Sequence, residues 1–265
     1  MTNIILVAVL ALGCIGFVAA AILYVCSRKF AVKEDPRLAQ VSAVLPQANC
    51  GGCGFAGCSA YAAAVAEGTA KPGLCSPGGK ALAEKMGEIM GVAVEDSERK
   101  VAFVFCQGGK DVTKEDYIYQ GIKDCNAASL LFQGPNACKE GCLHMGSCMA
   151  VCPVKAISYD ENGDVKVDKE KCVGCGACTK VCPNGVIKLV PYSAEYLVAC
   201  NNHEAGGKAK KNCLKACIGC KMCVLKVENS PFTVDKFLSV NDYSKDQSAC
   251  PLAAEKCPQK CIVRR

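Results

Sequence analysis

Cysteines dominate the chemistry that this sequence could perform, because the chain carries 24 of them among 265 residues. Two groups of four follow one another, and each group ends in Cys-Pro. Their members are Cys138, Cys142, Cys148 and Cys152, then Cys172, Cys175, Cys178 and Cys182. The second group has the spacing C-x2-C-x2-C-x3-C-P, in which three thiolates of one loop hold a 4Fe-4S cluster and the fourth reaches a neighbouring cluster. The spacing therefore predicts a pair of iron–sulfur clusters.

Cross-ligation divides these eight thiolates between two clusters. We expect one cluster on Cys152, Cys172, Cys175 and Cys178, and the other on Cys138, Cys142, Cys148 and Cys182. The first group has irregular spacers and carries Met145 where a middle cysteine is expected. Cys138 is therefore expected to supply the missing ligand from upstream.

The segment between the two groups alternates apolar and polar residues over 156–168, around Asn162-Gly163. Asn-Gly tolerates positive φ at both turn positions, so this pattern predicts a β-hairpin. With its two cluster motifs, the unit resembles a bacterial two-cluster ferredoxin. A tetrahedral zinc site is the alternative, since C-x2-C pairs also suit zinc. Zinc gives no reason for two evenly spaced groups that end in proline, so clusters are favoured.

An upstream group has the pattern C-x2-C-x4-C-x16-C and predicts a separate cluster site, on Cys50, Cys53, Cys58 and Cys75. Its many glycines allow backbone N–H groups to approach cluster sulfurs and tune the potential. The same stretch matches G-x-G-x-x-G, but no strand precedes it, so a dinucleotide site is rejected. Residues 59–67 and 77–90 are predicted to be helices, the second ending at Gly91.

The C-terminal part carries a partial repeat of the ferredoxin-like unit. Residues 100–106 and 195–200 are both predicted strands that end in a cysteine, which suggests an internal repeat. A three-ligand loop follows the second strand, but Val227 occupies its fourth position and the tail keeps only Cys257-Pro258. Because these losses are complementary, they remove one cluster and leave the other complete. That cluster is expected on Cys217, Cys220, Cys223 and Cys257.

Apart from Cys14 and Cys26, which are expected to be small apolar residues of the N-terminal helix, six cysteines stand outside this scheme. Four of them are considered as extra ligands: Cys106, Cys125, Cys200 and Cys213. No compact spacing joins these four, so buried structural thiols are favoured over a further cluster. Cys213 could also displace Cys220 as a ligand. Cys250 and Cys261 are assigned no role.

The chain opens with 23 uncharged residues, Ile4 to Cys26. As a helix this run would span roughly 34 Å at about 1.5 Å per residue, enough to cross a bilayer. Arg28, Lys29 and Lys33 follow it, so the positive-inside rule predicts an outside N-terminus and cytoplasmic domains at the cell membrane. The run has no Asp, Glu, Lys, Arg or His side chain for moving an ion, so partner subunits would have to supply that step.

The net charge of +6 is concentrated in residues 193–265, which hold twelve Lys/Arg against seven Asp/Glu. Five lysines stand out as a candidate docking patch for an acidic electron carrier: Lys208, Lys210, Lys211, Lys215 and Lys221. A solvated surface is the alternative, and the sequence does not decide between them.

The fold class that these patterns predict is α+β, with one N-terminal transmembrane helix, a small helical 4Fe-4S domain and tandem ferredoxin-like domains. The expected boundaries are an anchor at 1–26, a cytoplasmic connector at 27–49, the 4Fe-4S domain at 50–99, a two-cluster ferredoxin-like domain at 100–192 and a degenerate one-cluster domain at 193–265. This arrangement requires about four 4Fe-4S clusters.

The order of these modules resembles the B subunit of the Rnf ion-translocating electron-transport complex, in its longer form. The resemblance covers almost the whole chain. It implies an electron relay without substrate chemistry of its own, reduced ferredoxin as donor, delivery to NAD through partner subunits, and movement of sodium ions or protons by the complex. The alternatives are the ferredoxin-like subunit of a membrane hydrogenase or formate dehydrogenase, in which the first cluster module is not expected, and a zinc-rich scaffold or nucleic-acid adaptor.

The complementary losses in the tail make Cys257 a testable ligand. Cys257→Ala should remove or convert one 4Fe-4S centre, because each cluster needs its fourth thiolate. Cys250→Ala and Cys261→Ala are matched controls and should leave the iron content unchanged. Iron and sulfide analysis of anaerobically purified protein measures the difference. Loss of iron in the Cys250→Ala protein instead would mean that the tail is aligned wrongly with a ferredoxin motif.

Overall fold

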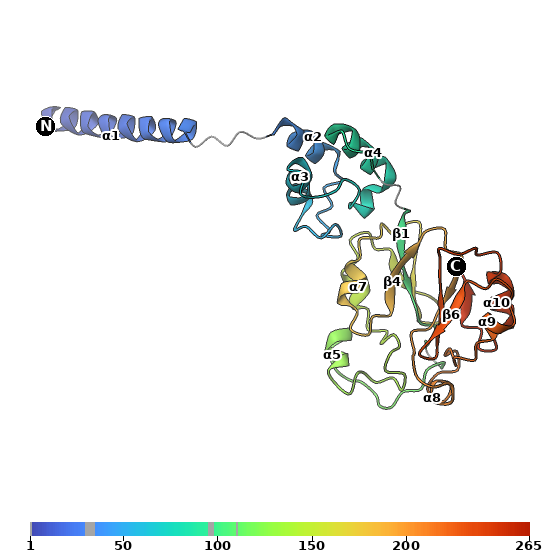
Figure 1. The fold of residues 1–265 in the computed structure, drawn as a ribbon. Helices are drawn as coiled ribbons and strands as arrows, with labels where there is room; N and C mark the ends of the chain where they lie inside the picture. The colour runs from blue at the N-terminus through green and yellow to red at the C-terminus, as the bar shows by residue number, and fades with distance from the viewer. Residues whose placement is uncertain (1, 30–34, 95–97, 110) are drawn as a thin grey trace.

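The computed structural model describes residues 2–29, 35–94, 98–109 and 111–265, without the side chains of 2–9, 11 and 12. Lys33 of the predicted basic flank lies outside these residues. The chain forms an N-terminal helix, a small helical domain and two α+β units in sequence (Figure 1).

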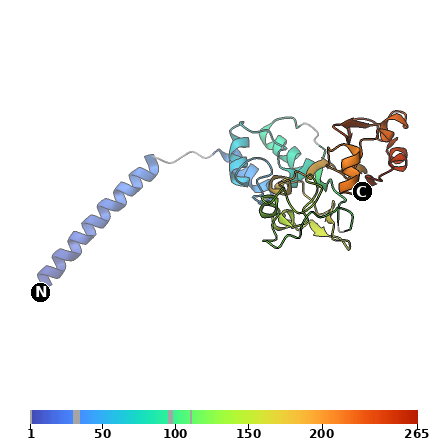
Figure 2. The same ribbon diagram turned by 90° about the horizontal axis from the view of Figure 1, so that it is seen from below.

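Helix α1 (Thr2–Lys29) carries Arg28 and Lys29 in its last turn and extends away from the rest of the chain (Figure 2). The apolar side chains described on this helix are exposed, as for Phe17, which is 77% exposed. Among the residues that the structure describes, no helix combines the length and the apolarity needed to span a membrane.

The helical domain contains α2 (Pro36–Val44), α3 (Cys58–Ala66), a 3-10 turn η1 (Ser76–Gly78) and α4 (Gly79–Met90). Asp35 caps α2, and Gly91 ends α4 in the left-handed conformation at φ 67°. Val41, Tyr61 and Met86 are fully buried between the helices. The helices predicted at 59–67 and 77–90 are confirmed, with the second starting as a 3-10 turn.

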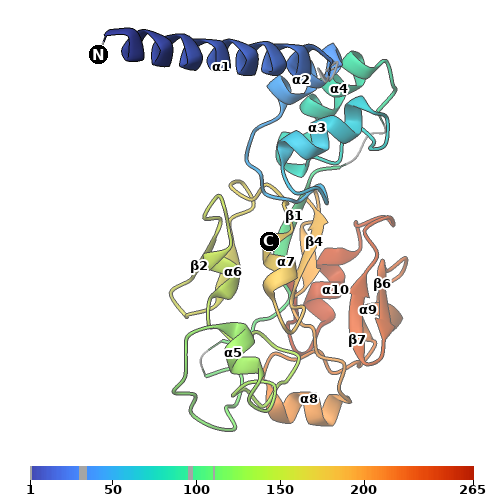
Figure 3. The same cartoon turned by 90° about the vertical axis from the view of Figure 1, so that its left-hand side faces the viewer.

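The first α+β unit is built from two small antiparallel sheets (Figure 3). Strand β1 (Lys100–Val104) pairs with β4 (Ile187–Pro191), and β2 (Ile157–Tyr159) pairs with β3 (Val165–Val167) across the predicted Asn-Gly hairpin. Its short helices are α5 (Cys125–Ser129), α6 (Ser147–Ala150) and α7 (Ala177–Val181). Because α6 and α7 each start at a cysteine loop, they present cysteines from their first turns toward the sheets.

The second unit repeats the pairing pattern of the first. Strand β5 (Tyr196–Val198) pairs with β8 (Ile262–Arg264), and β6 (Phe232–Asp235) pairs with β7 (Leu238–Asn241). Its helices are α8 (Gly206–Asn212), α9 (Met222–Leu225) and α10 (Cys250–Lys256). In both units the first strand pairs with the last strand while a hairpin forms the second sheet. The strands predicted at 100–106 and 195–200 are therefore present and hold equivalent places.

One glycine brings the helical domain against the first α+β unit, and a second brings the Cys172–Cys178 loop against β1. A Cβ atom at Gly52 would lie 2.7 Å from the carbonyl oxygen of Cys175, which is closer than real Cβ contacts. Without a side chain at Gly52, the cysteine loop of the helical domain can touch the Cys172–Cys178 loop. Gly174 has φ +65°, and a Cβ there would overlap the carbonyl oxygen of Lys100 in the same unit.

Candidate iron–sulfur centres

Twenty cysteines gather in five groups of four, which we name by number. Site 1 is Cys50, Cys53, Cys58 and Cys75; site 2 is Cys152, Cys172, Cys175 and Cys178; site 3 is Cys125, Cys142, Cys148 and Cys182; site 4 is Cys106, Cys138, Cys200 and Cys213; site 5 is Cys217, Cys220, Cys223 and Cys257. All of these thiols are free. Sites 1, 3, 4 and 5 line cavities of about 310, 350, 290 and 330 Å³. In the described parts of the chain, no group of three or more His, Cys, Asp or Glu side chains is arranged to hold a metal ion.

Site 1 is held by contacts at both ends of its loop. The amide oxygen of Asn49 accepts a hydrogen bond from the N–H of Cys58 at 2.8 Å, where α3 begins. The hydroxyl of Tyr61 donates to the carbonyl of Lys71 at 2.9 Å and accepts from the N–H of Leu74 at 3.1 Å. The distant Cys75 is thereby fixed beside the other three cysteines, as the C-x2-C-x4-C-x16-C spacing predicted.

Site 2 joins the Cys172–Cys178 loop to Cys152 of the preceding group. Burial is the largest influence on the Cys178 thiol, and Cys172, Cys175 and Cys152 lie close enough to act on it electrostatically, as does Cys148 of site 3. Backbone N–H groups point at two of the sulfurs: Ala102 donates to Cys172, and Ala156 donates to Cys152, both at 3.3 Å. Such donors stabilise negative charge on a thiolate and tune a bound cluster.

Site 3 contains Cys125 in the place where the sequence predicted Cys138. Asp124 caps α5 by accepting from the N–H of Ala127 at 2.9 Å. The hydroxyl of Ser147 donates to the other oxygen of Asp124 and accepts from the N–H of Cys125, both at 2.7 Å. These bonds attach the start of α5 to the start of α6, so Cys125 lies beside Cys148. The thiol of Cys125 therefore lines the cavity of site 3, whereas Cys138 lines the cavity of site 4.

Site 4 collects the remaining cysteines that the sequence considered as extra ligands, together with Cys138. Cys106 follows β1, Cys200 follows β5, and Cys213 follows α8. An isolated bridge between Thr113 and Cys213 holds the two units together beside this cavity. Their separation along the chain left no local spacing from which to predict the group.

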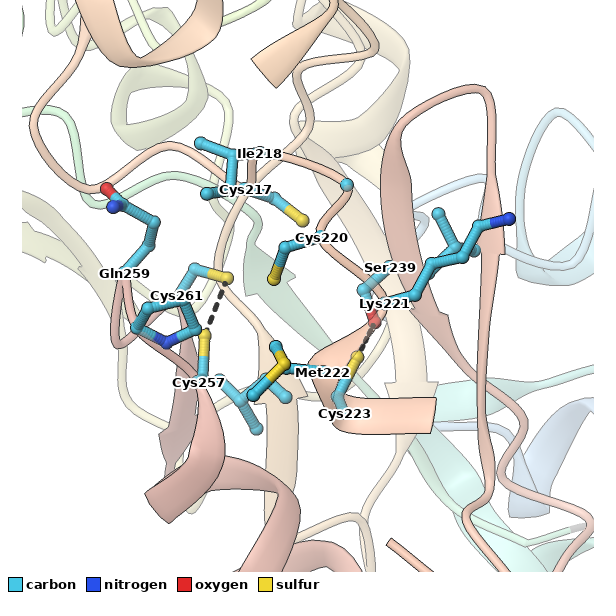
Figure 4. A pocket seen from close by; sticks show the side chains of 14 residues that line it. Cys217, Ile218, Cys220, Lys221, Met222, Cys223, Ser239, Cys257, Gln259 and Cys261 are labelled. Carbon is cyan, nitrogen blue, oxygen red and sulfur yellow. Dashed lines mark hydrogen bonds between the residues drawn. The ribbon is translucent and has the colours of Figure 1, made fainter. Parts of the chain in front are cut away.

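Site 5 is open at one side, where the Cys220 side chain is exposed. Figure 4 shows the sulfurs of the four site 5 cysteines and of Cys261 around one cavity. The sulfurs of Cys257 and Cys261 are 3.5 Å apart. The other close contact is between the Cys223 sulfur and the hydroxyl of Ser239, at 3.3 Å.

Cys261 shares a hydrogen bond with Cys257 in which either thiol can donate. Its hydrogen bond is the largest cause that lowers the pKa of Cys257 to about 5 and that of Cys217 to about 6, whereas its own pKa is raised. Cys261 stands four residues after Cys257, as the buried core residue Val186 stands four residues after Cys182. Its place in the fold is thus that of a core side chain.

Burial raises the pKa of nine other thiols in these sites. It is the largest cause at Cys138 and Cys178, whose pKa rises to about 12, and at Cys148 and Cys200, whose pKa rises to about 11. The charge of Cys106 adds to the effect at Cys138. Because ligation requires thiolates, metal binding at these sites must displace protons, and metal retention should weaken as the pH falls.

The five lysines of the candidate docking patch are all exposed. One of them, Lys208, forms an ion pair with Glu204 at 2.6 Å. Lys221 follows the exposed Cys220, so positive charge borders the open side of site 5. Cys250 is fully buried in α10 and belongs to no site.

Two known protein families match parts of this chain that contain these cysteine sites. Residues 45–77, which include site 1, match the family described as "Putative Fe-S cluster". Residues 137–189 match the family described as "4Fe-4S dicluster domain", which spans most of sites 2 and 3. The cofactors are therefore 4Fe-4S clusters.

Several curated proteins are similar along nearly the whole chain. The B subunit of the Na(+)-translocating ferredoxin:NAD(+) oxidoreductase complex of Acetobacterium woodii is 41% identical over 99% of this chain and 78% of its own length. The B subunit of the ion-translocating oxidoreductase complex of Methanosarcina acetivorans is 36% identical over 100% of both chains. The B subunit of the proton-translocating ferredoxin:NAD(+) oxidoreductase complex of Clostridium ljungdahlii is 38% identical over 98% of this chain and 92% of its own length.

The contact between Ser239 and Cys223 provides a test of how the protein tunes site 5. A thiolate bound to iron has no proton, so the Ser239 hydroxyl must be the donor in that state. Ser239→Ala should therefore leave the iron content unchanged and make the reduction potential of the site 5 cluster more negative.

A redox titration followed by EPR measures this shift. Ser158→Ala, at an exposed position of β2, is the control and should leave every potential unchanged. An unchanged site 5 potential in the Ser239→Ala protein would show that this hydrogen bond does not reach a ligand.

Proposed function

Because this chain belongs to the B-subunit family of ion-translocating oxidoreductase (Rnf) complexes, we propose that it accepts electrons from reduced ferredoxin and passes them to partner subunits. In the complex, the electrons would continue to NAD, as the names of the relatives state for those proteins. The observation that carries the proposal is the direct contact between successive cysteine loops.

Sites 1, 2, 3 and 5 are proposed to hold one 4Fe-4S cluster each, with Cys125 rather than Cys138 as the fourth ligand of site 3. Each bound cluster supplies reversible one-electron chemistry. The residues fit this cofactor because each site offers four thiols, and the N–H donors at site 2 point at sulfur rather than oxygen. The chain's own contribution is to exclude water from the sulfurs and to fix their positions.

Sites 1, 2 and 3 are consecutive. Gly52 of the site 1 loop lies against the backbone of Cys175 in site 2, and the charge of Cys50 acts on the Cys175 thiol. The charge of Cys148 in site 3 acts on Cys178 in site 2. An electron can therefore pass from the helical domain into the first ferredoxin-like unit without crossing bulk protein, which supports the domain division proposed from the sequence.

The five exposed lysines, of which Lys221 adjoins Cys220 of site 5, are proposed as the docking patch for the acidic electron donor. Cys220 is exposed there, so a docked carrier could bring its cluster close to a ligand of site 5. Opposite charge on the two partners would speed their encounter, and salt would screen the effect.

A charge-reversal experiment tests the donor and its docking site together. Reduced two-cluster ferredoxin should reduce the anaerobic full chain in detergent, which is followed by the loss of cluster absorbance. Lys210→Glu with Lys211→Glu should slow the second-order rate at low salt by about tenfold, because steering is lost.

The matched control is Lys85→Glu with Lys123→Glu, which changes the net charge equally at exposed lysines on other elements. This control should keep most of the wild-type rate. Equal slowing by both pairs would contradict a docking patch beside site 5, and failure of ferredoxin to reduce the wild-type chain would contradict the proposed donor.

Helix α1 is proposed as the anchor of the chain in the cell membrane, with the N-terminus outside and the cluster domains in the cytoplasm. The uncharged run 4–26, the exposed apolar side chains and the basic last turn of α1 support it. The full chain should sediment with membranes, whereas a chain of residues 27–265 should stay in the soluble fraction.

Tags at Met1 and Arg265 separate the two orientations. Labelling of the first tag from outside and of the second from inside is expected. Sedimentation of the shortened chain with membranes of cells that lack partner subunits would contradict anchoring by α1.

A further inference from the structure

Site 4 lies outside every compact cysteine motif, and its four thiols come from four separate segments of both ferredoxin-like units. Cys106 and Cys138 belong to the first unit, and Cys200 and Cys213 belong to the second. The four side chains line one cavity of about 290 Å³.

The two units contribute equivalent pairs of thiols to site 4. The N–H of Cys142 donates to the sulfur of Cys106 at 3.3 Å, and the N–H of Cys217 donates to the sulfur of Cys200 at 3.3 Å. Cys138 precedes Cys142 by four residues, as Cys213 precedes Cys217. Unrelated buried cysteines would not be expected to repeat both the hydrogen bond and the spacing.

The surroundings of site 4 suit thiolates that share their charge with a metal cluster. Cys138, Cys200 and Cys213 are 6–8% exposed. The N–H of Gly108 donates to the Cys106 sulfur at 3.3 Å, and the Asn202 amide donates to the Cys138 sulfur at 3.5 Å. Among the described residues that line the cavity, none is a carboxylate and one is a lysine, Lys215. Burying four thiolates would cost free energy unless a metal centre balanced their charge. Thiolates are soft ligands, so the metal centres that suit them are iron–sulfur clusters, zinc and copper.

Hydrogen bonds connect site 4 directly to its neighbours on both sides. Cys142 is a ligand of site 3, and its N–H contacts the site 4 sulfur of Cys106. Cys217 is a ligand of site 5, and its N–H contacts the site 4 sulfur of Cys200. Site 4 therefore stands between the first unit and the second, where a relay needs a redox centre and a zinc ion would carry no electron.

We propose that Cys106, Cys138, Cys200 and Cys213 hold a fifth 4Fe-4S cluster, which carries electrons between the two ferredoxin-like units. The proposal rests on the electron-relay function proposed above. In each transfer the site 4 cluster gains one electron while a neighbouring cluster is oxidised by one electron, and it then reduces the cluster on its other side. No bond to the protein forms or breaks.

Double substitutions in the full chain test whether these four cysteines bind one cluster together. The sequence instead favoured Cys138 as a ligand of another cluster and the other three as structural thiols. Cys106→Ala with Cys200→Ala should lower the iron and sulfide content by about one fifth, the loss of one cluster from five. Cys138→Ala with Cys213→Ala should give the same loss, and so should the quadruple variant, because all four residues serve one cluster. Cys250→Ala is the control at a buried cysteine outside the five sites and should lose no iron.

Other outcomes would overturn the proposal. If the Cys138 and Cys213 pair removes two clusters while the Cys106 and Cys200 pair removes none, Cys138 and Cys213 are ligands of sites 3 and 5. Zinc in place of iron at site 4 of the wild-type chain would exclude an electron-carrying role. Two further measurements are made on the same samples. Iron retained in the other four sites shows that the variants have folded. Reduction by ferredoxin shows whether the proposed relay function holds.

Discussion

The bond between buried thiolates and cluster iron is the interaction on which this structure depends. The described strands are three to five residues long, every sheet has two strands, and several helices have only four or five residues. Elements of this size are not stable alone. The cysteines themselves form much of the core of the second unit, where Cys200, Cys213, Cys217 and Cys257 pack with Phe232 and Leu238. Metal binding and folding are therefore coupled in this chain.

The repeated unit explains why one half of the molecule differs from the other. Both units keep the strand that leads to a cysteine and the C-x3-C that follows. In the first unit, Met145 stands where a cysteine is expected, and Cys125 on α5 is proposed to supply the fourth ligand of site 3, whose cavity it lines. In the second unit the ligands of one cluster are lost together, which leaves site 5 complete and opens it to solvent at Cys220. The first unit thus keeps two sites, and the second keeps one site that a partner can approach.

The spacing of cysteines along the chain predicted several of the five sites. The placement of Cys125 and the grouping of site 4 depend instead on how distant segments pack. Sites 1 and 2 follow from compact motifs, and the Asn-Gly hairpin and the helices at 59–67 and 77–90 follow from turn and capping signals. The placement of Cys125 depends on the Asp124 and Ser147 hydrogen bonds between two loops, which no periodic pattern encodes. Site 4 depends on the packing of the two units around the Thr113–Cys213 bridge, so its ligands lie up to about a hundred residues apart along the chain. The sequence analysis considered Cys106, Cys200 and Cys213 as extra ligands but assigned Cys138 to another cluster, because no spacing joins the four.

In the proposed relay, five clusters form one continuous series in which each centre lies beside the next. EPR of the fully reduced, anaerobically purified full chain is the most direct test of this series, because reduced clusters that are neighbours interact magnetically. We expect a broad spectrum from interacting centres that simplifies when Cys106 and Cys200 are replaced by alanine, since the link between the two units is then removed. A wild-type spectrum equal to the sum of independent, non-interacting clusters would contradict it.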